Sequence, residues 1–320
     1  MLYDIAVKYY YYLTYLRSEK RGPMFYFTHK DFPGLKHKPY PFKSSRGHNL
    51  SGFFYEYDNP IPGRIIIFEH GMGTGHRAYM REIEILARHG YRVFSYDHTG
   101  CEESGGEDTG GLTQSLMDLN DALNTLKSDP EYQNEAFSVI GHSWGGFSTL
   151  NINIFHPDVR HQISFSAFRS FKAMLQSNSF LGMWRRLYRS EMKRDLFRPE
   201  THAVDSLKQT KAQVLIVHSK DDKVVDYGDH FKYMKKALED YPNIRFLTQK
   251  NKGHNPNYTE DAVQYKKDFF KIVRKLMKTG RTPTQEELND FFAQHDFWRM
   301  TAQDEDVWRE VFAVLDNTEN

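Results

Sequence analysis

The chain has 320 residues, enough for one large domain with inserted or appended segments. Its 43 lysines and arginines balance 42 acidic residues, so the net charge of +1 gives no global attraction for nucleic acid or an acidic partner. Cys101 is the only cysteine, which excludes an intrachain disulfide, and no apolar run approaches the roughly 20 residues of a membrane span. The start of the chain lacks a signal-peptide pattern, because Asp4 and Lys8 interrupt the apolar stretch. We therefore expect a soluble, cytoplasmic protein.

Residues 1–39 are predicted to form an N-terminal helix and a connector. Apolar side chains recur at helical spacing over residues 1–18, at Leu2, Ile5, Tyr9, Leu13 and Leu16. We interpret this segment as a helix docked on the main body. Its tyrosines and basic residues also suit a headgroup boundary, so peripheral membrane contact through residues 1–18 is the alternative interpretation. Residues 31–40 contain two prolines, one glycine and little periodicity, which indicates a connector.

Residues 40–279 show an alternation of strands and helices. Residues 40–42 and 50–57 are predicted to form a strand pair, and the apolar run 64–69 a strand buried on both faces. Further strands are predicted at 91–96, 136–140, 162–167, 213–218 and 244–249, and helices at 76–89, 112–126, 227–238 and 261–277. Strands separated by helices of this length imply a mainly parallel sheet with helices on both faces, an α/β fold.

Two helical regions break this alternation. Residues 171–211 are too long for an ordinary crossover, and we interpret them as a cap over the strand ends. Methionine and aromatic side chains adapt to apolar ligands, so Met183, Trp184 and Tyr188 are predicted to contact substrate. The alternative is a helical insertion with a small core of its own. Residues 280–320, with helical segments at 285–292 and 305–315, are predicted to form a C-terminal appendage without chemistry.

The segment 136–146, AFSVIGHSWGG, carries the clearest chemical signal. It predicts a buried strand that turns sharply at Ser143 into a helix, with the G-x-S-x-G spacing of a serine nucleophile. The turn strains the serine backbone, and a side chain at Gly141 or Gly145 would collide with neighbouring backbone. The N-terminus of the following helix favours negative charge that develops beside the serine.

A nucleophilic serine needs a base and an orienting acid, and late loops provide both. His254 follows the predicted strand 244–249, and Gly253 lets that loop approach the serine. Asp221 and Asp222 follow the predicted strand 213–218. Asp222 has the better placement, although it could also cap the helix 227–238. The order Ser143, Asp222, His254 is that of α/β-hydrolases.

Other polar residues near these strand ends are assigned supporting roles. His70 and His142 are predicted to be structural supports rather than catalysts. Neither the lone cysteine nor the scattered histidines have metal-site spacing, and no cofactor is implied.

Three further motifs match a known superfamily. A strand ends in His70-Gly71-Met72, the segment 97–104 matches D-x-R-G-x-G-x-S except for Thr99 and Glu102, and the segment 218–225 matches H-G-x-x-D-x-x-V except for Ser219. Over residues 40–277 the chain resembles the α/β-hydrolase superfamily of serine hydrolases, most of all bacterial monoacylglycerol-lipase and esterase-type proteins.

This resemblance implies a roughly eight-stranded α/β-hydrolase sheet with a helical cap. It also implies that the backbone N–H groups of Met72 and Trp144 form the oxyanion hole, and the segment 218–225 supports Asp222 over Asp221. The expected reaction is hydrolysis of a carboxylic ester, with a lipid-like or aromatic acyl group, through an acyl-enzyme. A serine aminopeptidase of the proline-iminopeptidase type and a non-catalytic binding protein of the same fold are the alternatives.

Overall fold

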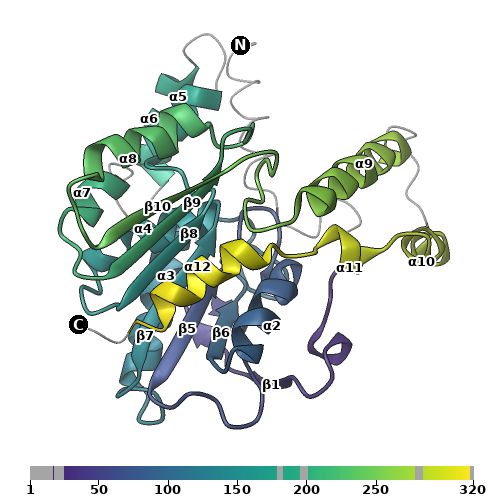
Figure 1. Cartoon of the computed structure of the whole chain (residues 1–320), viewed down its shortest axis with the longest axis horizontal. Helices are drawn as coiled ribbons and strands as arrows, with labels where there is room; N and C mark the ends of the chain where they lie inside the picture. The colour runs from purple at the N-terminus through teal and green to yellow at the C-terminus, as the bar shows by residue number, and fades with distance from the viewer. Residues whose placement is uncertain (1–16, 18–24, 179–182, 195–200, 278–283, 318–320) are drawn as a thin grey trace.

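The computed structural model describes residues 17, 25–178, 183–194, 201–277 and 284–317 (Figure 1). The helix predicted over residues 1–18 lies outside this part of the chain except for Arg17, so it stays a prediction. Among the described residues, no helix combines the length and the apolar character that a bilayer span requires.

The centre of the molecule is a sheet of eight strands in the order β1-β4-β6-β5-β7-β8-β9-β10. Strand β4 runs antiparallel to its neighbours β1 and β6, and the other pairs are parallel. The strands are β1 (Lys36–Pro39), β4 (Gly52–Glu56), β5 (Arg64–Glu69), β6 (Arg92–Tyr96), β7 (Ala136–His142), β8 (His161–Phe165), β9 (Gln213–Ser219) and β10 (Ile244–Gln249). This confirms the predicted mainly parallel, eight-stranded sheet.

Alternating side chains of the central strands enter opposite layers, because successive residues of a strand point to opposite faces. Ile65, Ile67 and Val139 pack with α3 (Gln114–Ser128) and α4 (Trp144–Asn151). Ile66 and Ile140 pack on the other face with α2 (Met80–Arg88) and α12 (Glu305–Leu315), which lie in front of the sheet in Figure 1. A third cluster joins β9 and β10 to α7 (Ala203–Leu207) and α8 (Tyr233–Leu238).

The last helix of the C-terminal segment packs on the sheet and contributes to its core. Val307, Val311 and Leu315 of α12 are fully buried against the sheet, and α12 contacts β8 and β9. One face of the central strands would therefore be open without residues 305–315. Between α9 (Glu260–Met277) and α12 lie α10 (Gln285–Ala293) and the short α11 (Phe297–Met300).

Several smaller elements differ from the prediction. The expected connector contains a 3₁₀ turn, η2 (His29–Asp31), and the edge strand β1, while β2 (Phe42–Lys43) and β3 (Asn49–Leu50) form a separate two-stranded ladder. The helix predicted from residue 76 begins as the 3₁₀ turn η3 (His76–Tyr79), and the one from residue 227 as a π-helix, η5 (Tyr227–Lys232). The short 3₁₀ turn η4 (Ile152–Ile154) extends α4. The predicted cap contains α5 (Phe171–Asn178) and α6 (Trp184–Arg194), which pack together.

Candidate active site

Ser143 lies on a strained turn between β7 and α4. Its φ of 55° and ψ of −108° lie outside the regions that non-glycine residues ordinarily adopt. A Cβ atom added to Gly141 would lie 2.4 Å from the Gly145 carbonyl oxygen, and one added to Gly145 would lie 2.4 Å from the Glu69 carbonyl oxygen. The predicted collision at both glycines is confirmed, so the local sequence enforces a turn that presents the serine at the end of the strand.

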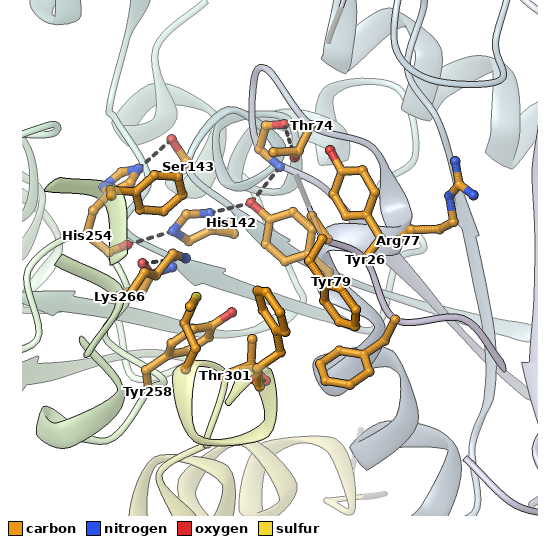
Figure 2. Close-up of a pocket in the computed structure, with 18 of the residues that line it drawn as sticks. Tyr26, Thr74, Arg77, Tyr79, His142, Ser143, His254, Tyr258, Lys266 and Thr301 are labelled. Carbon is orange, nitrogen blue, oxygen red and sulfur yellow. Dashed lines mark hydrogen bonds between the residues drawn. The ribbon is translucent and has the colours of Figure 1, made fainter. Parts of the chain in front are cut away.

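The turn brings Ser143 to His254, and His254 to Asp222. His254 Nε2 lies 2.9 Å from Ser143 Oγ, and its Nδ1 lies 2.8 Å from Asp222 Oδ2 (Figure 2 draws the first contact). The His254 side chain is 21% exposed, whereas Asp222 is buried. The three groups form one continuous hydrogen-bonded chain, in which an imidazole can take the serine proton while a carboxylate stabilises its charged form.

Asp222, not Asp221, is the acid in contact with this imidazole. Its Oδ1 accepts hydrogen bonds from the backbone N–H groups of Val224 and Val225. Burial opposes the ionised form of Asp222, but the imidazoles of His218 and His254 outweigh it and hold the pKa below its usual value.

Asp221 contacts the loop that carries His254 but not the His254 imidazole. It accepts hydrogen bonds from Ser219 Oγ and from the Gly253 backbone N–H. The helix that Asp222 was alternatively expected to cap is capped by Asp226, whose side chain accepts from the Asp229 backbone. Gly253 has a φ of 52°, and a Cβ atom there would meet only one distant side chain. The glycine is therefore favoured by its left-handed backbone conformation, while its predicted part in the approach of the loop to the serine stays a prediction.

His142 links the serine turn to the base. Its Nε2 donates to the His254 carbonyl oxygen at 2.7 Å, so its Nδ1 carries the lone pair that accepts from the Tyr79 hydroxyl at 2.8 Å. The Tyr79 oxygen in turn accepts from the Gly71 N–H. Burial, with the nearby His254, lowers the pKa of His142 to about 3, which keeps its imidazole neutral. These contacts agree with the supporting role predicted for His142, while Tyr79 had no sequence signal.

The residues expected to form the oxyanion hole lie on both sides of Ser143. Met72 follows Gly71 at the end of β5 and lines the same pocket as Ser143. Trp144 is the first residue of α4, where backbone N–H groups have no partner within the helix. Its indole is buried and donates to the Leu112 carbonyl oxygen, which fixes the start of the helix. The role of these two N–H groups stays a prediction.

Ser143 lines a cavity of about 290 Å³ (Figure 2). Its lining includes residues just after β5, the end of β7 and residues of the His254 loop. Its walls come from both ends of the described chain, since residues 25–27 face the C-terminal part. The aromatic and aliphatic side chains of these walls are Phe25, Tyr26, Phe27, Tyr258, Phe269, Phe270, Phe297 and Met300.

The cap residues predicted to contact substrate lie elsewhere. Met183, Trp184 and Tyr188 pack against the hydrophobic cluster that contains Phe171 and Leu187, and none lines the cavity at Ser143. Their predicted contact with substrate is untested. The aromatic side chains of the cavity walls come instead from residues 25–27, Tyr258, α9 and α11.

The C-terminal segment is also attached to the loop that carries His254. Lys252 forms an ion pair with Asp304, and the Asp304 backbone N–H donates to the Asn257 carbonyl oxygen at 2.8 Å. The Thr259 N–H donates to the Ala302 carbonyl oxygen at 3.0 Å. These contacts fix the base loop and the pocket wall together. Within the described ranges, no group of three or more His, Cys, Asp or Glu side chains is arranged to hold a metal ion.

Comparisons with known proteins agree with this architecture. A family model described as "Serine aminopeptidase, S33" matches residues 60–195. The "Putative carbamate hydrolase RutD" of Agrobacterium fabrum is 30% identical over 94 residues, 29% of this chain and 33% of that protein. The matches span only about a third of the length of the curated relatives.

Among solved structures, the Pyrococcus furiosus esterase Pf2001 is similar with a TM-score of 0.58 at 18% identity, over 81% of this chain and 97% of that one. The Pyrococcus horikoshii acylaminoacyl peptidase is similar with a TM-score of 0.52 at 17% identity, over 76% of this chain and 42% of that one. At these identities the likeness concerns the fold.

Proposed function

We propose that the chain is a serine hydrolase of the α/β-hydrolase superfamily that cleaves a carboxylic ester, since it has the fold of that superfamily and a serine-aminopeptidase family model matches residues 60–195. The observation that carries the proposal is the continuous contact from Ser143 Oγ through the His254 imidazole to Asp222. In addition, the serine lines a cavity with many aromatic side chains and lies next to a helix N-terminus.

The reaction has two steps. His254 Nε2 accepts the Ser143 proton as Oγ attacks the ester carbonyl carbon, and Asp222 stabilises the imidazolium that forms. The oxyanion accepts hydrogen bonds from the Met72 and Trp144 N–H groups, each worth on the order of 3 kcal/mol in the transition state. His254 then protonates the departing alcohol. Water attacks the acyl-enzyme through the same base, which releases the acid and restores the serine.

A serine aminopeptidase is the second candidate, favoured by the family model that matches residues 60–195. An aminopeptidase holds the positive α-amino group of its substrate with acidic side chains. The described residues that line the cavity include Arg77 and Lys266 but no aspartate or glutamate. This lining charge favours an ester over a peptide with a free amino terminus.

Labelling with a fluorophosphonate tests the proposal directly. We expect the wild-type protein to gain one adduct by intact mass and to hydrolyse p-nitrophenyl esters, and Ser143→Ala to do neither while it remains folded. Amino-acid p-nitroanilides turned over faster than the esters would support the aminopeptidase. A folded wild type that is inert to every probe would support a binding protein.

A further inference from the structure

Two cationic side chains line the cavity at Ser143, and among the described residues only one of them has a carboxylate within ion-pair distance. Arg77 Nη2 lies 3.4 Å from Glu102 and 3.7 Å from Glu103, so its charge is matched within the protein. Lys266 of α9 has no such match. None of the described carboxylates lies within ion-pair distance of its ammonium, whose recorded polar contact is with the Asn255 side-chain oxygen at 3.2 Å.

The surroundings of Lys266 are poor in compensating charge. Its Nζ lies 5.0 Å from the centre of the Tyr258 ring, and Phe269 and Phe270 line the same wall. Burial lowers the pKa of Lys266 from its usual value, and the nearby buried Glu82 only partly opposes this. An ammonium has three donors, and the Asn255 contact occupies one of them. Two of its donors therefore remain for a ligand in the cavity.

Lys266 is also close to the reacting groups. Figure 2 shows it beside His254 and His142, at the opposite end of the view from Arg77. Its charge contributes to the low pKa of His142, which agrees with this proximity. Lys266 and Ser143 line the same cavity, so a single bound molecule can contact both.

We propose that Lys266 binds a carboxylate of the substrate, so that the preferred substrate is an ester that also carries a negative charge. Such a molecule is either a half-ester of a dicarboxylic acid or an ester of a carboxylated alcohol. The inference rests on the proposed ester hydrolysis at Ser143. Charge-assisted hydrogen bonds between ammonium and carboxylate are among the stronger ones in proteins, and an aromatic wall raises their strength by excluding water.

Two matched pairs of esters test the inference. The first pair is p-nitrophenyl hemiglutarate and its neutral methyl ester, with the charge on the acyl side. The second is the pentanoyl ester of 4-hydroxybenzoate and that of methyl 4-hydroxybenzoate, with the charge on the alcohol side. The readout is the ratio of kcat/KM for the charged over the neutral member, because a general loss of folding or catalysis changes both members alike.

Wild type is expected to prefer the charged member of one pair, which also identifies the side that carries the carboxylate. Lys266→Met should lower that ratio by about ten- to a hundredfold, and Lys266→Arg should retain most of it. The exposed neighbour on α9 provides the control, since Lys267→Met should leave the ratio unchanged.

A wild type that prefers the neutral member of both pairs, or an equal ratio in wild type and Lys266→Met, would overturn the inference. Either result leaves ester hydrolysis intact. By contrast, absence of fluorophosphonate labelling and of turnover with all four esters would overturn the proposed function itself.

Discussion

His142 Nε2 donates a hydrogen bond to the carbonyl oxygen of His254, the candidate base. The residue before the nucleophile therefore holds the backbone of the residue that activates it. Through Tyr79, the same contact extends to Gly71, which precedes the expected oxyanion donor Met72. One chain of hydrogen bonds thus connects nucleophile, base and oxyanion loop.

This chain of hydrogen bonds predicts that Tyr79→Phe, which removes one of its hydroxyl groups, lowers activity and stability. Gly71 N–H would lose its acceptor, and His142 Nδ1 its donor. We expect kcat/KM for a p-nitrophenyl ester to fall by about tenfold or more, because small displacements of reacting groups are costly. The free energy of unfolding should fall by about 1–3 kcal/mol.

Tyr57→Phe is the matched control, since the Tyr57 hydroxyl donates to Glu84 on α2 and does not line the cavity. If both variants retain the wild-type rate, this chain of hydrogen bonds does not position the active site.

Asp222→Asn and Asp221→Asn distinguish the two neighbouring carboxylates. Asp222 contacts the His254 imidazole, so its amide would favour the wrong tautomer and lower kcat by about 10³- to 10⁴-fold. Asp221 contacts only Ser219 and the Gly253 backbone among its recorded partners, so its replacement should lower kcat by less than about tenfold. Steady-state kinetics of both variants would decide, and the reverse order of effects would contradict the assignment.

Gly145→Ala should destabilise the fold by at least about 1–3 kcal/mol, because the new Cβ atom would lie 2.4 Å from the Glu69 carbonyl oxygen. Urea unfolding measures the change. Gly228→Ala is the control, since the one atom near its Cβ is the side-chain oxygen Oδ1 of Asp226 at 3.1 Å, and no backbone atom beyond its own helix lies within 4 Å. Equal stability of the two variants would show that the turn can relax around a methyl group.

Stability should also fall as the pH falls from about 6.5 to 4. Burial lowers the pKa of His142 to about 3, and that of His161 and His230 to about 4. Below their unfolded value near 6.5, the unfolded chain binds protons that the folded protein does not, so the contribution of each is full above pH 6.5 and is lost on acidification. Glu69, whose pKa burial raises to about 7, acts in the opposite sense but offsets only one of the three.

His230→Gln tests this dependence away from the cavity. Between pH 4.5 and 6, its free energy of unfolding should vary with pH by about 1.4 kcal/mol per pH unit less than that of wild type. Urea unfolding at several pH values provides the slopes. Parallel slopes would mean that His230 is protonated equally in both states.

Local patterns predicted the central strands and brought out the three candidate residues. Ser143, Asp222 and His254 each follow a strand whose apolar run is evident in the sequence, and parallel strands end at one edge of a sheet. The edge strand β1 was missed because its sequence, KHKP, is polar and ends in proline. Such strands are held by pairing with a neighbour, here β4, rather than by burial of their own side chains.

The walls of the cavity could not be predicted for a different reason. Phe25 stacks on Phe297 at 3.8 Å between ring centres, although 271 positions separate them in the chain. A contact between residues so far apart in the chain produces no periodic pattern in the local sequence. The Lys252–Asp304 ion pair is another contact between distant residues, and it attaches the C-terminal segment to the loop that carries His254.

This arrangement has a consequence for synthesis of the protein on the ribosome. A nascent chain that has emerged as far as α9 already contains nucleophile, acid and base. It still lacks Asp304, which anchors the base loop, and Phe297, which closes the cavity against Phe25. The pocket is therefore complete only after residues 297–304 have emerged from the ribosome. A shorter nascent chain would carry the reactive serine without a complete pocket around it.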